Sequence, residues 1–211
     1  MWLHRWAARL YEPLLGAMLS SLREEVTALC EHPSVVAACP GDGDRPRRIL
    51  DCCCGPGGLS RLLRERGMEV IGVDMSELML KFARRWVSDV TFLRADARTL
   101  PFTAGEFDVA AISLALHSMD AGVANAVLRE LLRVAAVVIV ADFCLAERNL
   151  ELPANAAIRV VEWLIGSEHY RNCRRFMEQG GVEGLLYRHQ LRVLERRHVL
   201  GGGATVAAVV N

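Results

Sequence analysis

The fold is decided by the stretch Arg47-Arg48-Ile49-Leu50-Asp51-Cys52-Cys53-Cys54-Gly55-Pro56-Gly57-Gly58-Leu59-Ser60. Ile49 and Leu50 form a short apolar run that ends in the carboxylate of Asp51, as expected for a buried strand of a parallel sheet. A glycine-rich turn follows, and leucines then recur at helical spacing over residues 59–63. A strand, a turn and a helix in this order present backbone N–H groups at the carboxyl edge of a sheet, where open α/β folds bind ligands.

The composition sets the bounds of the fold. The chain has 211 residues, of which 52% are hydrophobic, and this is enough for one sizeable core. The formal net charge is zero, so the sequence shows no excess of positive charge of the kind that binds nucleic acid. The longest apolar run, residues 134–141, is far below the roughly 20 residues that span a bilayer, so no integral membrane segment is expected.

The cellular location is predicted from the cysteines and from the first residues. Seven cysteines, an odd number with three of them adjacent, fit a reducing compartment better than a disulfide framework. Charged residues also interrupt the apolar stretch at the N-terminus, where a signal peptide needs an unbroken core. We therefore expect a cytoplasmic protein.

Short apolar runs alternate with helical patterns along the chain. The run that ends at Asp74 and the run before Asp96 repeat the arrangement in which a carboxylate follows a strand. This alternation predicts a parallel sheet with helices on both faces. The expected strands cover residues 49–51, 69–74, 90–93, 107–114, 135–140, 191–200 and 204–210.

The last two runs are joined only by the glycines at 201–203. A link this short can join antiparallel strands but leaves no room for a crossover helix. The predicted fold is therefore α/β, a Rossmann-like doubly wound sheet of about seven strands. It is mostly parallel, with a C-terminal antiparallel hairpin and extra N-terminal helices.

We expect a single domain with four parts. Residues 1–45 form an N-terminal helical arm and residues 46–142 a cofactor-binding core. Residues 143–190 form a helical insertion on the substrate side, and residues 191–211 the closing hairpin. For the arm, two interpretations stay open: a lid or packing arm, and a helix that simply covers the sheet edge.

Asp74 is predicted to lie beside the glycine turn. It follows Asp51 by one strand-helix-strand unit, which puts it at the carboxyl end of the neighbouring strand. A carboxylate there can accept hydrogen bonds from both hydroxyls of a ribose. The alternative is that Asp74 or Ser76 only caps the helix that starts near Glu77.

These motifs resemble those of the class I S-adenosylmethionine-dependent methyltransferases, especially the quinone-biosynthesis C-methyltransferases. The likeness extends over nearly the whole chain, including the closing hairpin. Its motifs lie at residues 49–57, 72–76, 94–102 and 107–117. A nicotinamide dinucleotide site is the main rival, but Ser60 stands at its third glycine and the closing hairpin has no place in that fold.

The resemblance implies roles for single residues. Asp51 would hold the methionine ammonium, Asp74 the ribose hydroxyls and Asp96 the adenine amino group. Ser113 and Leu114 would lie near the methionine portion and the sulfonium. The implied site for S-adenosylmethionine, with S-adenosylhomocysteine as product, consists of Asp51, Cys53, Gly55, Gly57, Asp74, Met75, Asp96, Ala97, Ser113 and Leu114.

Two positions depart from the family pattern. The family usually has glycine at the position of Cys53, so the turn must accept a side chain that bears a thiol. The usual Pro-Gly-Gly before the fifth strand is absent, so that residues 133–135 must turn tightly.

The catalytic residues depend on the acceptor. A sulfonium is already an activated methyl donor, so the first task is to hold acceptor and methyl in line in a dry pocket. His117, His169 and Tyr170 are the candidates for proton removal or substrate orientation. The alternatives are a packed, hydrogen-bonded histidine at 117 and a helix-start cluster at 169 and 170.

The predicted function is methyl transfer to a small acceptor, aromatic or lipid-like, by a monomer or homodimer. An alternative is a non-catalytic S-adenosylmethionine-binding protein that acts as a sensor or partner subunit. The two differ in whether the three candidate catalytic residues converge on one pocket. No metal is expected, because Cys52 and Cys54 point away from Cys53 along an extended segment.

Overall fold

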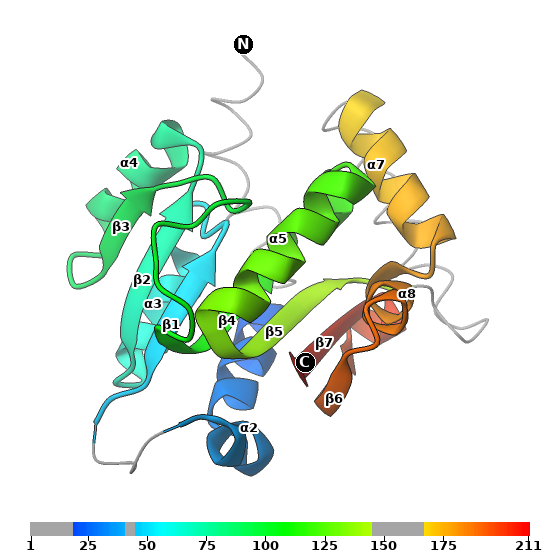
Figure 1. The fold of residues 1–211 in the computed structure, drawn as a ribbon. Coiled ribbons are helices and arrows are strands. Elements are labelled where there is room, and N and C mark those ends of the chain that lie inside the picture. Colours follow the sequence, from blue (N-terminus) through cyan, green and yellow to red (C-terminus); the bar gives the residue numbers. More distant parts are fainter. Residues whose placement is uncertain (1–18, 41–44, 145–166) are drawn as a thin grey trace.

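The computed structural model describes residues 19–40, 45–144 and 167–211, which build a layered α/β fold around one sheet (Figure 1). The seven strands have the order β3-β2-β1-β4-β5-β7-β6. Their bounds are β1 Arg48–Cys52, β2 Glu69–Asp74, β3 Thr91–Arg94, β4 Phe107–Ser113, β5 Ala135–Phe143, β6 Arg192–Val199 and β7 Ala204–Val210.

The strand pairing confirms the expected topology. β1 to β5 pair in parallel, whereas β7 pairs antiparallel with both β5 and β6. In the register of β1, Asp51 lies opposite Gly72 of β2 and Ala111 of β4. The carboxyl ends of β1, β2 and β4 therefore meet at one edge of the sheet.

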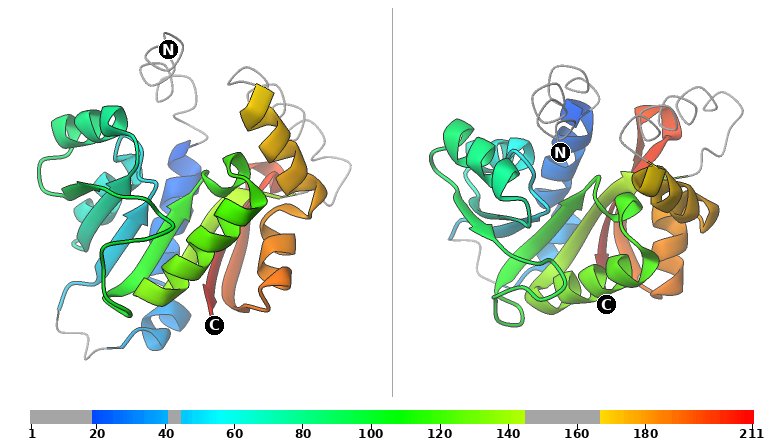
Figure 2. Two further views of the ribbon diagram at one scale, coloured as in Figure 1. Left: turned by 45° about the horizontal axis from the view of Figure 1, so that its top comes forward. Right: turned by 90° about the horizontal axis from the view of Figure 1, so that it is seen from above.

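Helices cover both faces of the sheet (Figure 2). One face packs against helix 19–30 together with α2, α3 and α4, and the other packs against α5, α7 and α8. The bounds are α2 Pro33–Ala38, α3 Gly58–Glu65, α4 Glu77–Trp86, α5 Ala121–Val134, α7 Ser167–Glu178 and α8 Gly181–Arg188, with short 3-10 helices η1 at Leu116–Ser118 and η3 at Leu200–Gly202.

Alternation along the strands assigns each side chain to one face. In β1, Ile49 packs on the first face, whereas Leu50 and Cys52 pack on the second. Because side chains alternate in a strand, Asp51 and Asp74 point toward the face that carries helix 19–30 and α3. The two carboxylates at the strand ends are thereby directed to the same side of the sheet.

The element boundaries differ from the prediction in detail. β5 runs to Phe143, three residues beyond the expected Val140, because its last residues pair with β7. α5 ends at Val134 and β5 begins at Ala135, so the tight turn expected at 133–135 is made without an intervening loop residue. α8 was not predicted as a separate helix.

Parts of two predicted segments lie outside the described residues. These are residues 1–18 and 41–44 of the N-terminal arm and residues 145–166 of the helical insertion. Within the described ranges, no helix is long and apolar enough to cross a membrane.

Candidate functional site

A cavity of about 500 Å³ opens at the carboxyl ends of β1, β2 and β4. Its walls come from helix 19–30, the turn after β1, the end of β2 with α4, and the segment from Ser113 to η1 and the start of α5. The described residues that line it are Leu19, Leu22, Arg23, Asp51, Cys53, Cys54, Gly55, Pro56, Leu59, Asp74, Met75, Met79, Ser113, Leu114, Ala115, Ser118, Met119 and Val123.

Asp51 brings a buried carboxylate to this cavity. Its side chain is almost fully enclosed, and Ser60 donates a hydrogen bond from Oγ to Oδ2 at 2.5 Å. Burial raises the pKa of Asp51 to about 7, against the lowering effects of Ser60 and of the positive charge of Arg23. A cation that docks beside this carboxylate would stabilise its charged form.

Asp74 ties the glycine turn to the end of β2. Its Oδ2 accepts a hydrogen bond from the Gly55 backbone N–H at 2.9 Å, and its Oδ1 accepts one from the Ser76 N–H at 2.7 Å. The N-cap of α4 is Ser76, whose hydroxyl accepts from the N–H of Met79. Asp74 is therefore not the helix cap. Each carboxylate oxygen has further acceptor capacity for a ligand hydroxyl.

The turn after β1 is built from left-handed backbone. Gly55 and Gly57 have φ angles of 54° and 84°, and Cys53 has a φ of 58°. An L-residue in this region costs about 1–2 kcal/mol, which gives a physical reason for the glycine that the family usually has at the position of Cys53. The turn accepts the thiol at that cost, and Cys53 lies half-buried in the cavity wall.

Arg23 is a cavity residue that the sequence did not reveal. It comes from helix 19–30 and extends over the start of α3, where a Cβ added to Gly58 would lie 2.5 Å from its guanidinium carbon. The guanidinium therefore stands close to the buried carboxylate of Asp51, whose pKa it lowers. No local motif marks Arg23, because its role depends on where the arm packs.

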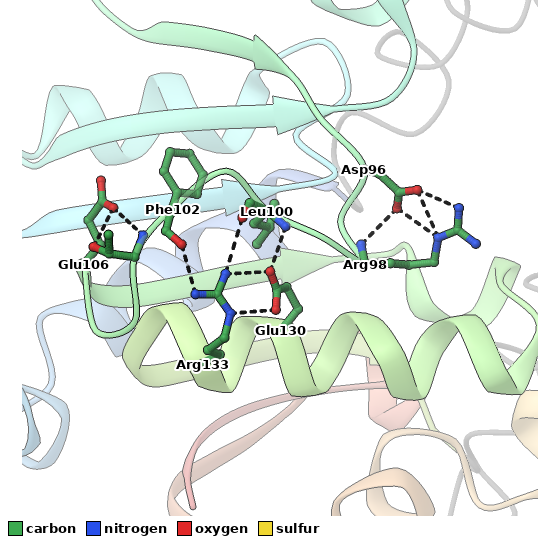
Figure 3. A network of polar contacts seen from close by, with 8 residues as sticks. Asp96, Arg98, Leu100, Phe102, Glu106, Glu130 and Arg133 are labelled. Atoms are coloured by element: carbon green, nitrogen blue, oxygen red, sulfur yellow. Dashed lines mark hydrogen bonds and ion pairs between the residues drawn. The ribbon is translucent and has the colours of Figure 1, made fainter.

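The loop after β3 carries Asp96, which the sequence assigned to adenine. Arg98 holds Asp96 through its guanidinium, with an Nη2–Oδ2 distance of 2.6 Å, and this contact lowers the pKa of the carboxyl (Figure 3). Glu130 and Arg133 of α5 bond the loop at Leu100, where the backbone N–H donates to Glu130 at 2.7 Å. The loop is thereby fixed to α5.

The predicted cofactor residues fall into two groups. One group lies together on the cavity wall and consists of Asp51, Cys53, Gly55, Asp74, Met75, Ser113 and Leu114. Gly57, Asp96 and Ala97 are not among the lining residues in the described part of the chain. Gly57 supports the turn from behind, where a Cβ would meet the ring of Phe92 at 3.0 Å.

Two of the three predicted catalytic residues are in contact. The rings of His117 in η1 and His169 in α7 meet edge to face, with their centroids 5.3 Å apart. His117 is 3% exposed and precedes Ser118, which lines the cavity, but none of the three predicted catalytic residues is itself among the described lining residues. Tyr170 follows His169 in α7 and is half-buried.

A doubly wound sheet with an antiparallel seventh strand and a cavity at its carboxyl edge defines a Rossmann-like fold. Residues 49–137 match the family described as a methyltransferase domain. The matched segment runs from β1 into β5 and includes the glycine turn with Asp51 and Asp74.

Characterised relatives match part of the chain. A malonyl-[acyl-carrier protein] O-methyltransferase of Enterobacter lignolyticus is 40% identical over 73 residues, which are 35% of this chain and 29% of that protein. A demethylmenaquinone methyltransferase of Thermus thermophilus is 43% identical over 79 residues, 35% of this chain and 36% of that protein. The chain thus spans about a third of the length of these relatives.

Solved structures share the fold over most of the chain. The PH0226 protein of Pyrococcus horikoshii superposes with a TM-score of 0.61 at 23% identity, over 80% of this chain and 83% of that one. The magnesium protoporphyrin IX methyltransferase of Synechocystis, solved with bound S-adenosylhomocysteine, gives a TM-score of 0.60 at 19% identity, over 90% of this chain and 83% of that one. At these identities the likeness concerns the fold alone.

Proposed function

We propose that this protein transfers a methyl group from S-adenosylmethionine to a small acceptor of aromatic or lipid-like character. The observation that carries the proposal is the pair of carboxylates, Asp51 and Asp74, on either side of the glycine turn in one cavity. S-adenosylmethionine supplies a methyl group on a positively charged sulfonium. The chain supplies the groups that bind and orient it.

The cavity fits the chemistry of this cofactor. Its volume of about 500 Å³ lies within the roughly 300–1,000 Å³ usual for ligand pockets. The buried carboxylate of Asp51 suits the methionine ammonium, because a neighbouring cation offsets the desolvation that raises its pKa. Asp74 offers both carboxylate oxygens to the ribose hydroxyls.

The adenine is assigned to the end of the cavity beyond Asp74. Met75, which is 55% exposed, and Met79 give that end an apolar surface for a flat ring. Asp96 and Ala97 remain the predicted partners of the adenine edge. The ion pair with Arg98 means that the Asp96 carboxylate would have to accept from the adenine amino group in addition to Arg98, or in its place.

The acceptor is assigned to the apolar part of the cavity. Leu19 and Leu22 of helix 19–30 face this space, as do Leu114, Met119 and Val123. Such a lining favours an acceptor with a substantial apolar surface. The relatives named above act on demethylmenaquinone and on a malonyl group carried by a protein, and the apolar lining favours a molecule of the first kind.

The rings of His117 and His169 are in contact, but His117, His169 and Tyr170 are not among the described residues that line the cavity. A protein that only senses S-adenosylmethionine would also need Asp51, Asp74 and the turn, so the proposal of catalysis is supported by the match to a methyltransferase domain and not by the imidazoles. We further propose that the reaction takes place in the cytoplasm, in a monomer or homodimer, without nucleic acid as substrate.

Calorimetric titration of the reduced protein with S-adenosylmethionine and S-adenosylhomocysteine tests the cofactor assignment. Binding of both in the micromolar range is expected. Asp74→Asn should weaken binding by about 2 kcal/mol, roughly thirtyfold, because it replaces a charged acceptor of hydroxyls. The matched control is Asp89→Asn, which removes a carboxylate from an exposed loop away from the cavity and should leave the affinity unchanged.

Three outcomes separate the assignments. If the folded wild-type protein binds neither ligand, the proposed function is wrong. If it binds both and Asp74→Asn binds equally well, the ribose assignment is wrong while the function stands. A loss of affinity in Asp89→Asn as large as that in Asp74→Asn would indicate a general charge effect and count against a specific contact.

A further inference from the structure

The charges on the cavity wall are complementary to those of the proposed cofactor. Among the described lining residues, Arg23 is the one basic side chain, and it stands against the two carboxylates of Asp51 and Asp74. The described lining therefore has one negative charge in excess when Asp51 is ionised. S-adenosylmethionine carries a sulfonium, an ammonium and a carboxylate, and so has one positive charge in excess. Asp51 and Asp74 have assigned partners on this molecule, which leaves its carboxylate to be matched.

Arg23 lies over the first turn of α3. A Cβ built on Gly58, the first residue of this helix, would lie 2.5 Å from the guanidinium carbon Cζ and 2.7 Å from each Nη atom. The guanidinium therefore lies against the backbone of Gly58. The next residue, Leu59, lines the cavity, as Arg23 itself does. The positive charge of Arg23 is thus held where the helix begins and the cavity wall ends.

Asp51 meets the same turn of α3. Its Oδ2 accepts a hydrogen bond from the hydroxyl of Ser60, the third residue of the helix, at 2.5 Å. Burial raises the pKa of Asp51 to about 7, and the positive charge of Arg23 is among the influences that lower it. A carboxylate and a guanidinium thus stand beside one helical turn, close enough for each charge to affect the other.

The beginning of α3 adds a positive potential to this corner of the cavity. Its N-cap is Gly57, which has no side chain to accept from the N–H groups of the first turn, and that turn carries no acidic side chain. The N–H groups and the dipole at a helix N-terminus favour an anion. Arg23 lies over the same end of the helix and favours an anion as well.

Two opposite charges beside one turn match the two ends of an α-amino acid, in which ammonium and carboxylate share one carbon atom. A guanidinium has five N–H donors, so Arg23 can hold a ligand carboxylate in addition to its contacts within the protein. Asp51 can accept from the ammonium at the same time, because each carboxylate oxygen has more than one lone pair. The corner therefore has a partner for both charges of the amino acid end.

We propose that Arg23 is a specificity-determining residue of the cavity: its guanidinium binds the carboxylate of the methionine part while Asp51 binds the ammonium, so that the cavity selects adenosyl thioethers with a complete amino acid end. This inference rests on the proposed function. It adds a residue of helix 19–30, which lies outside the residues 49–137 that match the methyltransferase domain. Two charged anchors would also limit rotation of the methionine chain and so orient the sulfonium.

Two ligands that differ only in the carboxylate test the inference. These are S-adenosylhomocysteine and its decarboxylated analogue, an adenosyl thioether with an aminopropyl chain, each titrated into the reduced protein by calorimetry. The wild type should bind S-adenosylhomocysteine at least about tenfold more tightly, because a charge-assisted contact contributes about this factor or more. Arg23→Gln should lose at least about tenfold in affinity for S-adenosylhomocysteine and bind the analogue as tightly as the wild type or more tightly.

Two further variants separate charge from structure. Arg23→Lys keeps the positive charge without the planar fork, so its affinity for S-adenosylhomocysteine should lie between those of the wild type and Arg23→Gln. The matched control is Arg85→Gln, which removes an exposed arginine from the last turn of α4, away from the cavity lining. This control should bind both ligands as the wild type does. Urea unfolding establishes that each variant is folded under the conditions of the titration.

The outcomes keep this inference apart from the proposed function. If the folded wild type binds neither ligand, the proposed function is wrong and the role of Arg23 falls with it. If the wild type binds S-adenosylhomocysteine and Arg23→Gln binds it equally well, the role of Arg23 is refuted while the function stands. An equal loss of both ligands in Arg23→Gln would show that the residue only supports the shape of the cavity, and would also overturn the inference.

Discussion

Gly55 and Gly57 lie in one turn with similar backbone, yet alanine should affect them in opposite ways. Both have a positive φ. A Cβ on Gly55 meets no protein atom within 4 Å, and Gly55 lines the cavity. A Cβ on Gly57 would lie 3.0 Å from the ring of Phe92 and 3.2 Å from the Cβ of Ala83. We therefore expect Gly55→Ala to impair binding and Gly57→Ala to impair stability.

The magnitudes follow from two contributions. Placing alanine at a positive φ costs about 1–2 kcal/mol, and the stiffer unfolded chain returns about 0.4–1 kcal/mol, so that each variant loses about 1 kcal/mol of unfolding free energy. Gly57→Ala adds overpacking against Phe92 and Ala83, typically about 1–3 kcal/mol. Its total loss is about 2–4 kcal/mol. For Gly55→Ala, a methyl group in the cofactor space should weaken binding at least about tenfold.

The assay combines urea unfolding with calorimetric titration of S-adenosylhomocysteine. Titration is done at a temperature at which both variants are folded, so that binding is compared between native proteins. Gly57→Ala should then bind within about threefold of the wild type. Equal stability of the two variants would refute the steric argument at Phe92. Unchanged affinity in Gly55→Ala would refute the location of the cofactor against the turn.

Three further predictions concern the stability of the folded protein. The pKa of Asp51 is raised to about 7 in the folded state, so the folded protein holds this proton more tightly than the unfolded chain does. The free energy of unfolding should therefore fall by on the order of 3 kcal/mol as pH rises from about 4 to 7. Urea titrations at several pH values should show that Asp51→Asn lacks this contribution. Cys53→Gly should raise the free energy of unfolding by up to about 1 kcal/mol, because glycine removes the strain of a side chain at a φ of 58° and this gain exceeds the cost of the more flexible unfolded chain. A less stable variant would mean that contacts of the thiol dominate. Gly72→Ala should lower the free energy of unfolding by about 1–3 kcal/mol, because its Cβ would lie 2.6 Å from the ring of Phe92. A melting temperature equal to that of the wild type would contradict this prediction.

Much of the fold was predictable because the strand ends carry their own signals. Continuous apolar runs followed by Asp51 and Asp74 identify buried parallel strands and place both carboxylates at one edge. The three-glycine link at 201–203 excludes a crossover helix and so determines the antiparallel end of the sheet. These features are local in sequence, and local patterns are what periodicity and turn chemistry report.

Contacts that depend on packing could not be predicted in the same way. Arg23 reaches the cavity only because helix 19–30 covers the face on which Asp51 points, and the polarity of a surface helix does not reveal which sheet face it will cover. Asp96 followed a strand as expected, yet Arg98, two residues later, binds it and draws it into a local ion pair. Long, flexible arginine side chains have too many rotamers for the sequence to choose between such partners.

The contact between Oδ1 of Asp142 in β5 and Nδ1 of His117 in η1, at 2.6 Å, was partly predictable, because it depends both on the strand order and on the strand register. Both residues follow or end adjacent parallel strands, and Ser113 of β4 pairs with Ala141 of β5, so the two segments must meet at the carboxyl edge. What the sequence left open was the register. Side chains alternate, so a slip of one residue would turn Asp142 to the opposite face and bring Ala141 or Phe143 under η1 instead. Pairing of β5 with β7, where Asp142 lies opposite Thr205, holds that register from the other side. The antiparallel hairpin at the end of the chain therefore contributes to positioning the imidazole, although it contributes no residue to the described lining of the cavity.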